Sequence, residues 1–345
     1  MKKLILVSWA VMAAHFSVAQ EKKQYEVQNF KGLVSIKGPS SGLIIEGYSG
    51  TSVIIEAEST EGKVPEKATG MRMVTAGGLD NTGIAATVEE ETVKVVTSIN
   101  EKGEEKEEEV RLLSINIAGT SKLFRNYVVK IPKGLTTRFR ESYEDSWGKK
   151  GVLKIQSLEG ELDVNCVDCS LEISGFSGNI IANNSSSRAT TKIEFSKLDQ
   201  NKITSINTDG ELEVLLPGDS KANLRLNSVR GNVYTDFDLK KAVVKTGREP
   251  LESVTVVGVP SAGRSNGTEI WGSAPTTVIS RGQGSYTIVG EAISPDTDGG
   301  EVKKMSLASV AAARKSRGRY DYTINDGGVY VSITSYSGNV YLKKK

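Results

Sequence analysis

The sequence contains a single histidine, His15, among its 345 residues. This residue lies in an N-terminal segment, MKKLILVSWAVMAAHFSVAQ, which has two lysines, an apolar run over 4–16 and small residues up to Ala19. That order is typical of a secretory signal peptide, so we expect residues 1–19 to be removed. The mature chain would then have no histidine, which excludes Ser-His-Asp and Cys-His catalysis and removes the commonest zinc ligand.

The chain also has almost no net charge. Lys and Arg number 44 against 42 Asp and Glu, and loss of Lys2 and Lys3 would leave 42 of each. A nucleic-acid partner is therefore not expected, because such binding needs a basic excess. The N-terminal apolar run is shorter than the ~20 residues of a membrane-spanning helix, so we expect no stable span after cleavage. An uncleaved membrane anchor is the alternative, and export to the periplasm, cell surface or medium is the favoured location.

Glycine is abundant, with 35 residues, and it marks a repeat. Residues 151–186 align in nines as GVLKIQSLE, GELDVNCVD, CSLEISGFS and GNIIANNSS. Two positions of each unit are apolar, the third and the fifth: Leu153, Leu162, Leu171 and Ile180, then Ile155, Val164, Ile173 and Ala182. Because apolar and mostly polar residues alternate, each unit predicts a short strand followed by a turn.

A strand of this length buries nothing alone, so successive units must stack their apolar positions into one core. The sequence therefore predicts an all-β, elongated β-solenoid or β-helix-like stack of strands with nine-residue strand-turn repeats. An antiparallel meander is the alternative, although it gives no reason for a fixed spacing.

Five segments follow from this pattern. We expect a signal peptide over 1–19, an N-terminal β region over 20–150 that continues into the solenoid, and a repeat-rich β-solenoid over 151–285. Residues 286–318 lose the alternation and predict a flexible insertion, and residues 319–345 predict closing C-terminal strands.

Six parts of the chain carry a resemblance to a known family: VSIKGPSSGLIIEGYSGTSVIIEA, LDNTG, NYVVKIPKGLTTRF, the glycine-marked strands from 151, ITSINTDGELEVLLPGDSKANLRLNSVRGNV and SITSYSGNVYLKKK. In these parts the chain resembles the bacterial putative-adhesin domain family. The resemblance covers most of the mature chain, although 240–318 fits least well. It implies an exported β-solenoid with no fixed catalytic set.

The two cysteines, Cys166 and Cys169, form a C-x-x-C motif. A redox C-x-x-C needs a helix N-terminus to lower the thiol pKa, and here a strand pattern follows instead. A zinc site needs about four ligands, which this chain lacks. In repeat phase, Cys169 occupies the glycine position of its unit. We expect a disulfide across this turn, with two inert thiols, or a redox or metal role, as alternatives.

Outward polar residues give the remaining candidates. Glu161 and Asp163 would project from one strand about 7 Å apart, which suits a carboxylate pair as well as a solvated strand face. The polar tract 183–187 could bind sugars or form a simple turn. Five aromatic residues could stack on sugars or pack in the core: Trp147, Trp271, Tyr330, Tyr336 and Tyr341.

The favoured function is therefore an exported, non-catalytic, adhesin-like binding or structural protein of the cell envelope. No cofactor, metal site or catalytic residue is expected, and glycans or surface and matrix proteins are the expected partners. The alternatives are a polysaccharide-processing enzyme that uses outward carboxylates and an envelope component that binds no foreign ligand.

Overall fold

The computed structural model describes residues 22–59, 66–69, 71, 74–75, 78–99, 105–118, 124–142, 151–198, 203–241, 277–281, 284–288, 304–306 and 321–345. The expected signal peptide over 1–19 lies outside these residues, as does most of the expected insertion over 286–318. The described chain is all-β, as expected, with one 3-10 turn, η1 (Glu66–Ala68).

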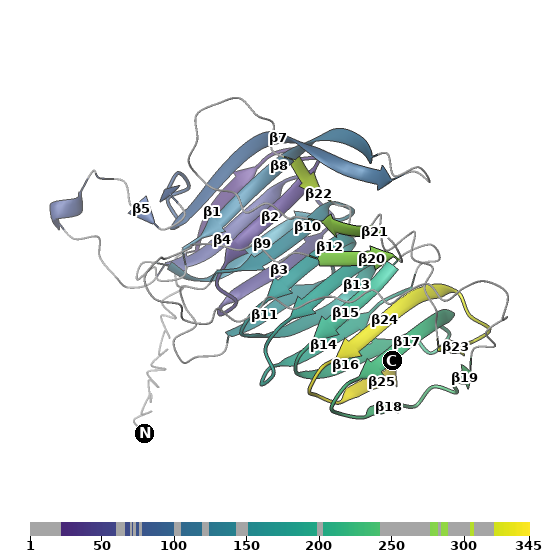
Figure 1. Ribbon diagram of the computed structural model, residues 1–345. Helices are drawn as coiled ribbons and strands as arrows, with labels where there is room; N and C mark the ends of the chain where they lie inside the picture. The colour runs from purple at the N-terminus through teal and green to yellow at the C-terminus, as the bar shows by residue number, and fades with distance from the viewer. Residues whose placement is uncertain are drawn as a thin grey trace, which may run out of the picture.

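Twenty-one strands form one continuous hydrogen-bonded sheet that curls so that two layers face each other (Figure 1). We call the layers sheet A and sheet B. The long strand β13 (Cys169–Asn184) joins them, because its first half pairs in sheet A and its second half in sheet B. The other strands of sheet A are, in spatial order, β1 (Lys22–Val27), β4 (Val53–Ser59), β9 (Phe124–Pro132), β3 (Leu43–Tyr48), β11 (Gly151–Gln156), β14 (Thr190–Phe195), β16 (Glu211–Leu216), β25 (Val340–Lys344) and β18 (Val233–Thr235).

Sheet B is the layer opposite sheet A, and most of its neighbouring strands are parallel. Its strands are, in spatial order, β22 (Lys304–Ser306), β7 (Ala86–Ile99), β8 (Glu105–Ile117), β2 (Leu33–Gly38), β10 (Thr136–Glu141), β12 (Glu159–Cys166), the second half of β13, β15 (Ile203–Thr208), β24 (Val329–Ser335), β17 (Ala222–Ser228), β23 (Tyr322–Ile324) and β19 (Lys240–Lys241). Two small antiparallel pairs lie outside both layers: β5 (Val74–Thr75) with β6 (Gly78–Leu79), and β20 (Thr277–Arg281) with β21 (Gly284–Ile288).

The repeated units alternate between the two sheets. The first and third units pair in sheet A, where Leu153 is in register with Leu171 on the neighbouring strand. The second and fourth units pair in sheet B, where Leu162 is in register with Ile180. Residues in register are therefore eighteen positions apart (171 − 153), and two units make one coil. This spacing does not continue, since Ile180 is next in register with Thr204.

The apolar third and fifth positions of all four units are buried between the sheets, as the alternation predicts. Leu153, Ile155 and Val164 are each fully buried. Burying a Leu or Ile side chain contributes about 1.5–3 kcal/mol, so this stacked column is a main source of stability.

Two of the C-terminal strands, β24 and β25, lie inside the stack. β24 pairs with β15 on one side and with β17 on the other, and β25 lies between β16 and β18. Among the described residues, β18 is therefore the edge strand of sheet A at this end, whereas in sheet B β17 is followed by β23 and β19 (Figure 1).

Candidate functional site

The cysteines lie in the turn that connects β12 to β13. The structure pairs Cys166 and Cys169 as a disulfide, with their Cα atoms 5.8 Å apart, and both side chains are fully buried. The carboxylate of Glu141 closes the turn, because its Oε2 atom accepts hydrogen bonds from the backbone N–H groups of Val167 at 2.7 Å and Asp168 at 3.0 Å. Asn184 Nδ2 also donates to the carbonyl oxygen of Cys169 at 2.9 Å, so side chains from two neighbouring strands hold this corner together.

The equivalent corners of other coils show what the disulfide replaces. Pairing in sheet B aligns Cys166 in one column with four residues: Asn184, Thr208, Ser335 and Ser228. Three of these four accept a hydrogen bond from the N–H of a following glycine: Thr208 from Gly210 at 3.1 Å, Ser335 from Gly338 at 3.0 Å, and Ser228 from Gly231 at 2.9 Å. The cysteines therefore make a covalent link where the later corners use a hydroxyl and a glycine.

A redox or metal role fits this corner less well. The carboxylate of Glu141 and the two sulfur atoms lie within 4.8 Å of one another, which is close enough for shared metal ligation. However, sulfurs bonded to each other offer no thiolate, and three ligands fall short of a structural zinc site. Cys169 also begins a strand, whereas a redox C-x-x-C motif stands at the N-terminus of a helix.

The two candidate carboxylates on β12 are each occupied by neighbouring side chains. Arg140 donates to both oxygens of Asp163, at 2.9 and 2.6 Å, and Arg138 Nε donates at 3.2 Å. Burial favours a raised pKa for Asp163, but Arg140 and then Arg138 outweigh it, and the pKa is lowered. Glu161 accepts a hydrogen bond from Asn179 Nδ2 at 2.9 Å. Asp163 therefore does not resemble a carboxylic acid with the raised pKa that a general acid needs.

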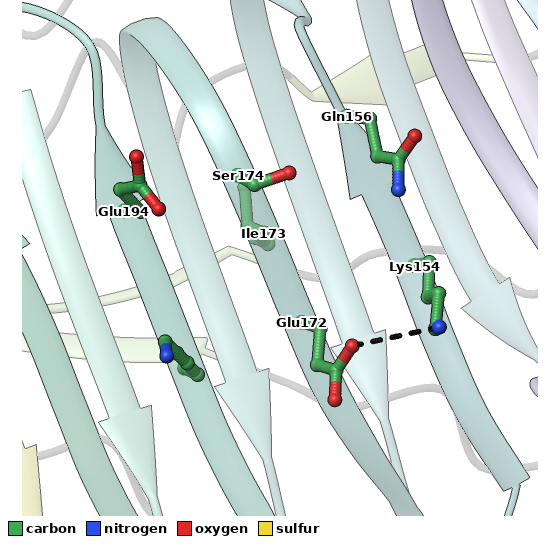
Figure 2. Close-up of a pocket in the computed structure, with 7 residues that line it drawn as sticks. Lys154, Gln156, Glu172, Ile173, Ser174 and Glu194 are labelled. Atoms are coloured by element: carbon green, nitrogen blue, oxygen red, sulfur yellow. Dashed lines mark ion pairs between the residues drawn. The ribbon is translucent and has the colours of Figure 1, made fainter.

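The outer surface of sheet A carries a shallow depression of about 260 Å³, which Figure 2 shows. It is lined by Lys154, Gln156, Glu172, Ile173, Ser174, Lys192 and Glu194. Across the strands the register aligns a row of alternating charge, which we call the charged row: Lys154, Glu172, Lys192 and Glu213.

The charges of this row neutralise one another. Lys154 Nζ lies 3.9 Å from Glu172, and Lys192 Nζ lies 3.7 Å from Glu213. Glu213 Oε2 also forms an ion pair with Lys343 Nζ at 3.5 Å. Such exposed pairs contribute only about 0–1 kcal/mol each, and each lysine of the row has an acidic partner.

The outer surface of sheet B carries a row of amide and hydroxyl side chains. The register aligns its members across five neighbouring strands, and we call them the amide row: Asn165, Asn183, Asn207, Thr334 and Asn227. All are partly or fully exposed, and Asn207 Nδ2 donates to Asn183 Oδ1 at 3.2 Å. Because neighbouring strands lie about 4.8 Å apart, the row presents donors and acceptors at regular intervals.

Only Asn183 of this row was among the residues that the sequence singled out, in the polar tract 183–187. That tract is divided, because Asn184 turns inward and donates to Thr191 Oγ1 at 3.0 Å. A signal for the row does exist in the sequence: Ser-Ile-Asn at 205–207 and Ser-Ile-Thr at 332–334 place a polar residue at the same strand position.

Three of the five aromatic candidates lie in the described part of the chain. Trp147 and Trp271 lie outside the described residues. Tyr336 is 47% exposed at a corner, and Tyr341 stacks on Tyr234 with ring centroids 5.4 Å apart. Tyr330 lies partly buried on β24. Tyr234 was not among the residues that the sequence singled out.

Comparisons with known proteins give little further guidance. No protein-family model matches the chain, and no curated protein matches it. Among solved structures, the chain is similar to a protein of Clostridium sporogenes ATCC 15579 described as "a putative cell adhesion protein". The two share 11% identity with a TM-score of 0.36, over 94% of this chain and 100% of that chain. So low a score carries no argument, and the resemblance to an adhesin family stays a prediction.

A search of the described residues for membrane spans found no helix with the length and apolar character to cross a bilayer.

Proposed function

We propose that the protein is an exported, non-catalytic binding protein of the adhesin-like kind, built as a β-solenoid and located at the cell envelope. The amide row is the observation that supports this proposal. It extends across the strands on a surface formed by regular backbone, so its spacing is set by the sheet rather than by loops.

The chemistry of the row suits a glycan. Each amide offers one carbonyl oxygen and two N–H donors, and each hydroxyl both donates and accepts, so the row matches the many hydroxyl groups of a sugar chain. A row that extends across five strands of a sheet favours an extended polymer over a small molecule.

The rival function, polysaccharide cleavage, would need two carboxylates free to donate and accept protons. Asp163 is held by two arginines and Glu161 by Asn179, so the same structure favours binding over turnover.

The test is a glycan and matrix-protein array probed with the chain from residue 20 onward, with turnover assays in parallel. We expect glycan binding without turnover. Asn183→Ala/Asn207→Ala should weaken this binding, because it removes the centre of the amide row.

A matched control is Lys154→Gln/Glu172→Gln, which removes a charge pair from the opposite sheet without changing the net charge. It should bind as the unaltered chain does. Turnover that Glu161→Gln abolishes would show the protein to be an enzyme, and an array without any bound ligand would refute the binding function.

A further inference from the structure

Exposed apolar side chains occur at the end of the stack that contains β17 and β18. Six large hydrophobic residues are strongly exposed in the described part of the chain, and four of them lie at this end: Val229, Val233, Tyr234 and Tyr336, at 54%, 38%, 49% and 47%. Exposed apolar side chains that lie near one another are typical of a surface that contacts a ligand or a protein partner.

Two tyrosines at this end of the stack have parallel, stacked rings. Tyr234 on β18 and Tyr341 on β25 face each other across neighbouring strands, with ring centroids 5.4 Å apart and planes 14° apart. Lys343 Nζ lies 5.5 Å from the centroid of Tyr341, and Asn339 Nδ2 donates to the Tyr341 hydroxyl at 3.2 Å. The inner ring is thus held in place by its neighbours.

The outer ring is at the edge of the sheet. Among the described residues, β18 pairs with β25 alone, and all three of its residues are exposed (Figure 1). The stack therefore ends with the ring of Tyr234, and a further flat group can be added beyond it.

Two cations near this end have no carboxylate partner among the described residues. Arg230 lies over the ring of Tyr336, 5.0 Å from its centroid, and Lys344 Nζ lies 5.4 Å from the centroid of Phe237. Asp236 Oδ1 accepts a hydrogen bond from the backbone N–H of Lys344 at 2.8 Å. This end therefore differs from the charged row, where each cation has an acidic partner.

We propose that the outer face of Tyr234 stacks on a pyranose ring of an acidic glycan, whose carboxylate pairs with Arg230 or Lys344. The apolar C–H face of a pyranose suits an aromatic ring, and the unpaired cations favour a uronic acid over a neutral sugar. The inference rests on the proposed glycan-binding function and names the ligand class and a second contact site.

The experiment is calorimetric titration of the chain with a galacturonic acid tetrasaccharide and with its methyl ester, which has the same linkage without charge. The acid should bind more tightly than the ester, and salt should weaken only the acid. Tyr234→Ala should lower the affinity for both about tenfold, and Tyr234→Phe should retain it, since the ring is what stacks.

Arg230→Gln should lower the affinity for the acid and leave that for the ester unchanged. Because Tyr234 and Arg230 are exposed, circular dichroism of these variants should match that of the unaltered chain. The inference is overturned if the acid does not bind, if ester and acid bind equally, or if Tyr234→Ala binds as well as the unaltered chain.

These failures differ from failure of the proposed function. If the array shows glycan binding that depends on Asn183 and Asn207 but not on Tyr234, the function stands and this second site does not. If no glycan or matrix protein binds at all, both are refuted.

Discussion

The corner that holds Cys166 and Cys169 leads to a quantitative prediction about stability. Later corners close with a hydroxyl at the first position and a glycine at the last, as in Ser335 and Gly338. The variant Cys166→Ser/Cys169→Gly therefore copies a corner that the protein already uses. Its matched partner, Cys166→Ala/Cys169→Gly, differs only in lacking the hydroxyl.

The expected magnitudes follow from the bonds exchanged. A cross-link that closes a loop of about four residues stabilises the fold by about 2 kcal/mol in the chain-entropy model. The hydroxyl should recover about 1 kcal/mol through its hydrogen bond, and the new glycine should cost about 0.5–1 kcal/mol. We therefore expect the Ser/Gly variant to be less stable than the unaltered chain by about 2 kcal/mol, and the Ala/Gly variant by about 3 kcal/mol.

Urea unfolding at equilibrium, without reductant, measures both differences. Added reductant should destabilise the unaltered chain and leave both variants unchanged. Equal stability of the Ser/Gly and Ala/Gly variants would show that the hydroxyl makes no bond at this corner, and the equivalence of the corners would be wrong.

Three further predictions concern single groups. The pKa of Asp163 is lowered in the folded chain, so its contribution to stability is complete above the unfolded value of about 4 and is lost as the pH falls through the folded value. Asp163→Asn should cost about 2 kcal/mol at neutral pH by leaving Arg138 with a weaker partner, and acid unfolding curves should lose that component; an unchanged acid profile would contradict this account. Gly338→Ala should cost at least about 2 kcal/mol, because a Cβ there would collide with the backbone of Gly210, whereas Gly218→Ala, which meets nothing within 4 Å, should be nearly neutral in the same thermal melt. Alkylation of the unreduced protein, read by mass spectrometry, should label neither cysteine, and full labelling of both would refute the disulfide.

The alternation of the repeat was sufficient to predict which residues are buried. Leu153 and Ile155 point inward, as predicted, because a strand sends successive side chains to opposite faces whatever its partner is. The pairing of Ile203 with Tyr330 could not be predicted, since the two are far apart in the sequence and no local pattern links them.

The candidate site divides in the same way. Repeat phase placed Cys169 in a glycine position, which the structure matches, because phase is a local property. The roles of Glu141 and Arg140 could not be predicted, since each reaches a turn or strand of the next coil. The complete amide row could not be predicted, because its members come from strands whose order in the sheet is known only from their pairing.

The eighteen-residue offset between facing strands has a consequence for changes in chain length. Over 151–186, consecutive units lie in opposite sheets, so duplication of one nine-residue unit there would shift the next unit to the opposite layer. Duplication of two units would keep each unit in its own layer and lengthen each sheet by one strand spacing, about 4.8 Å. In this part of the chain, a change in length that preserves the layers therefore comes in pairs of units.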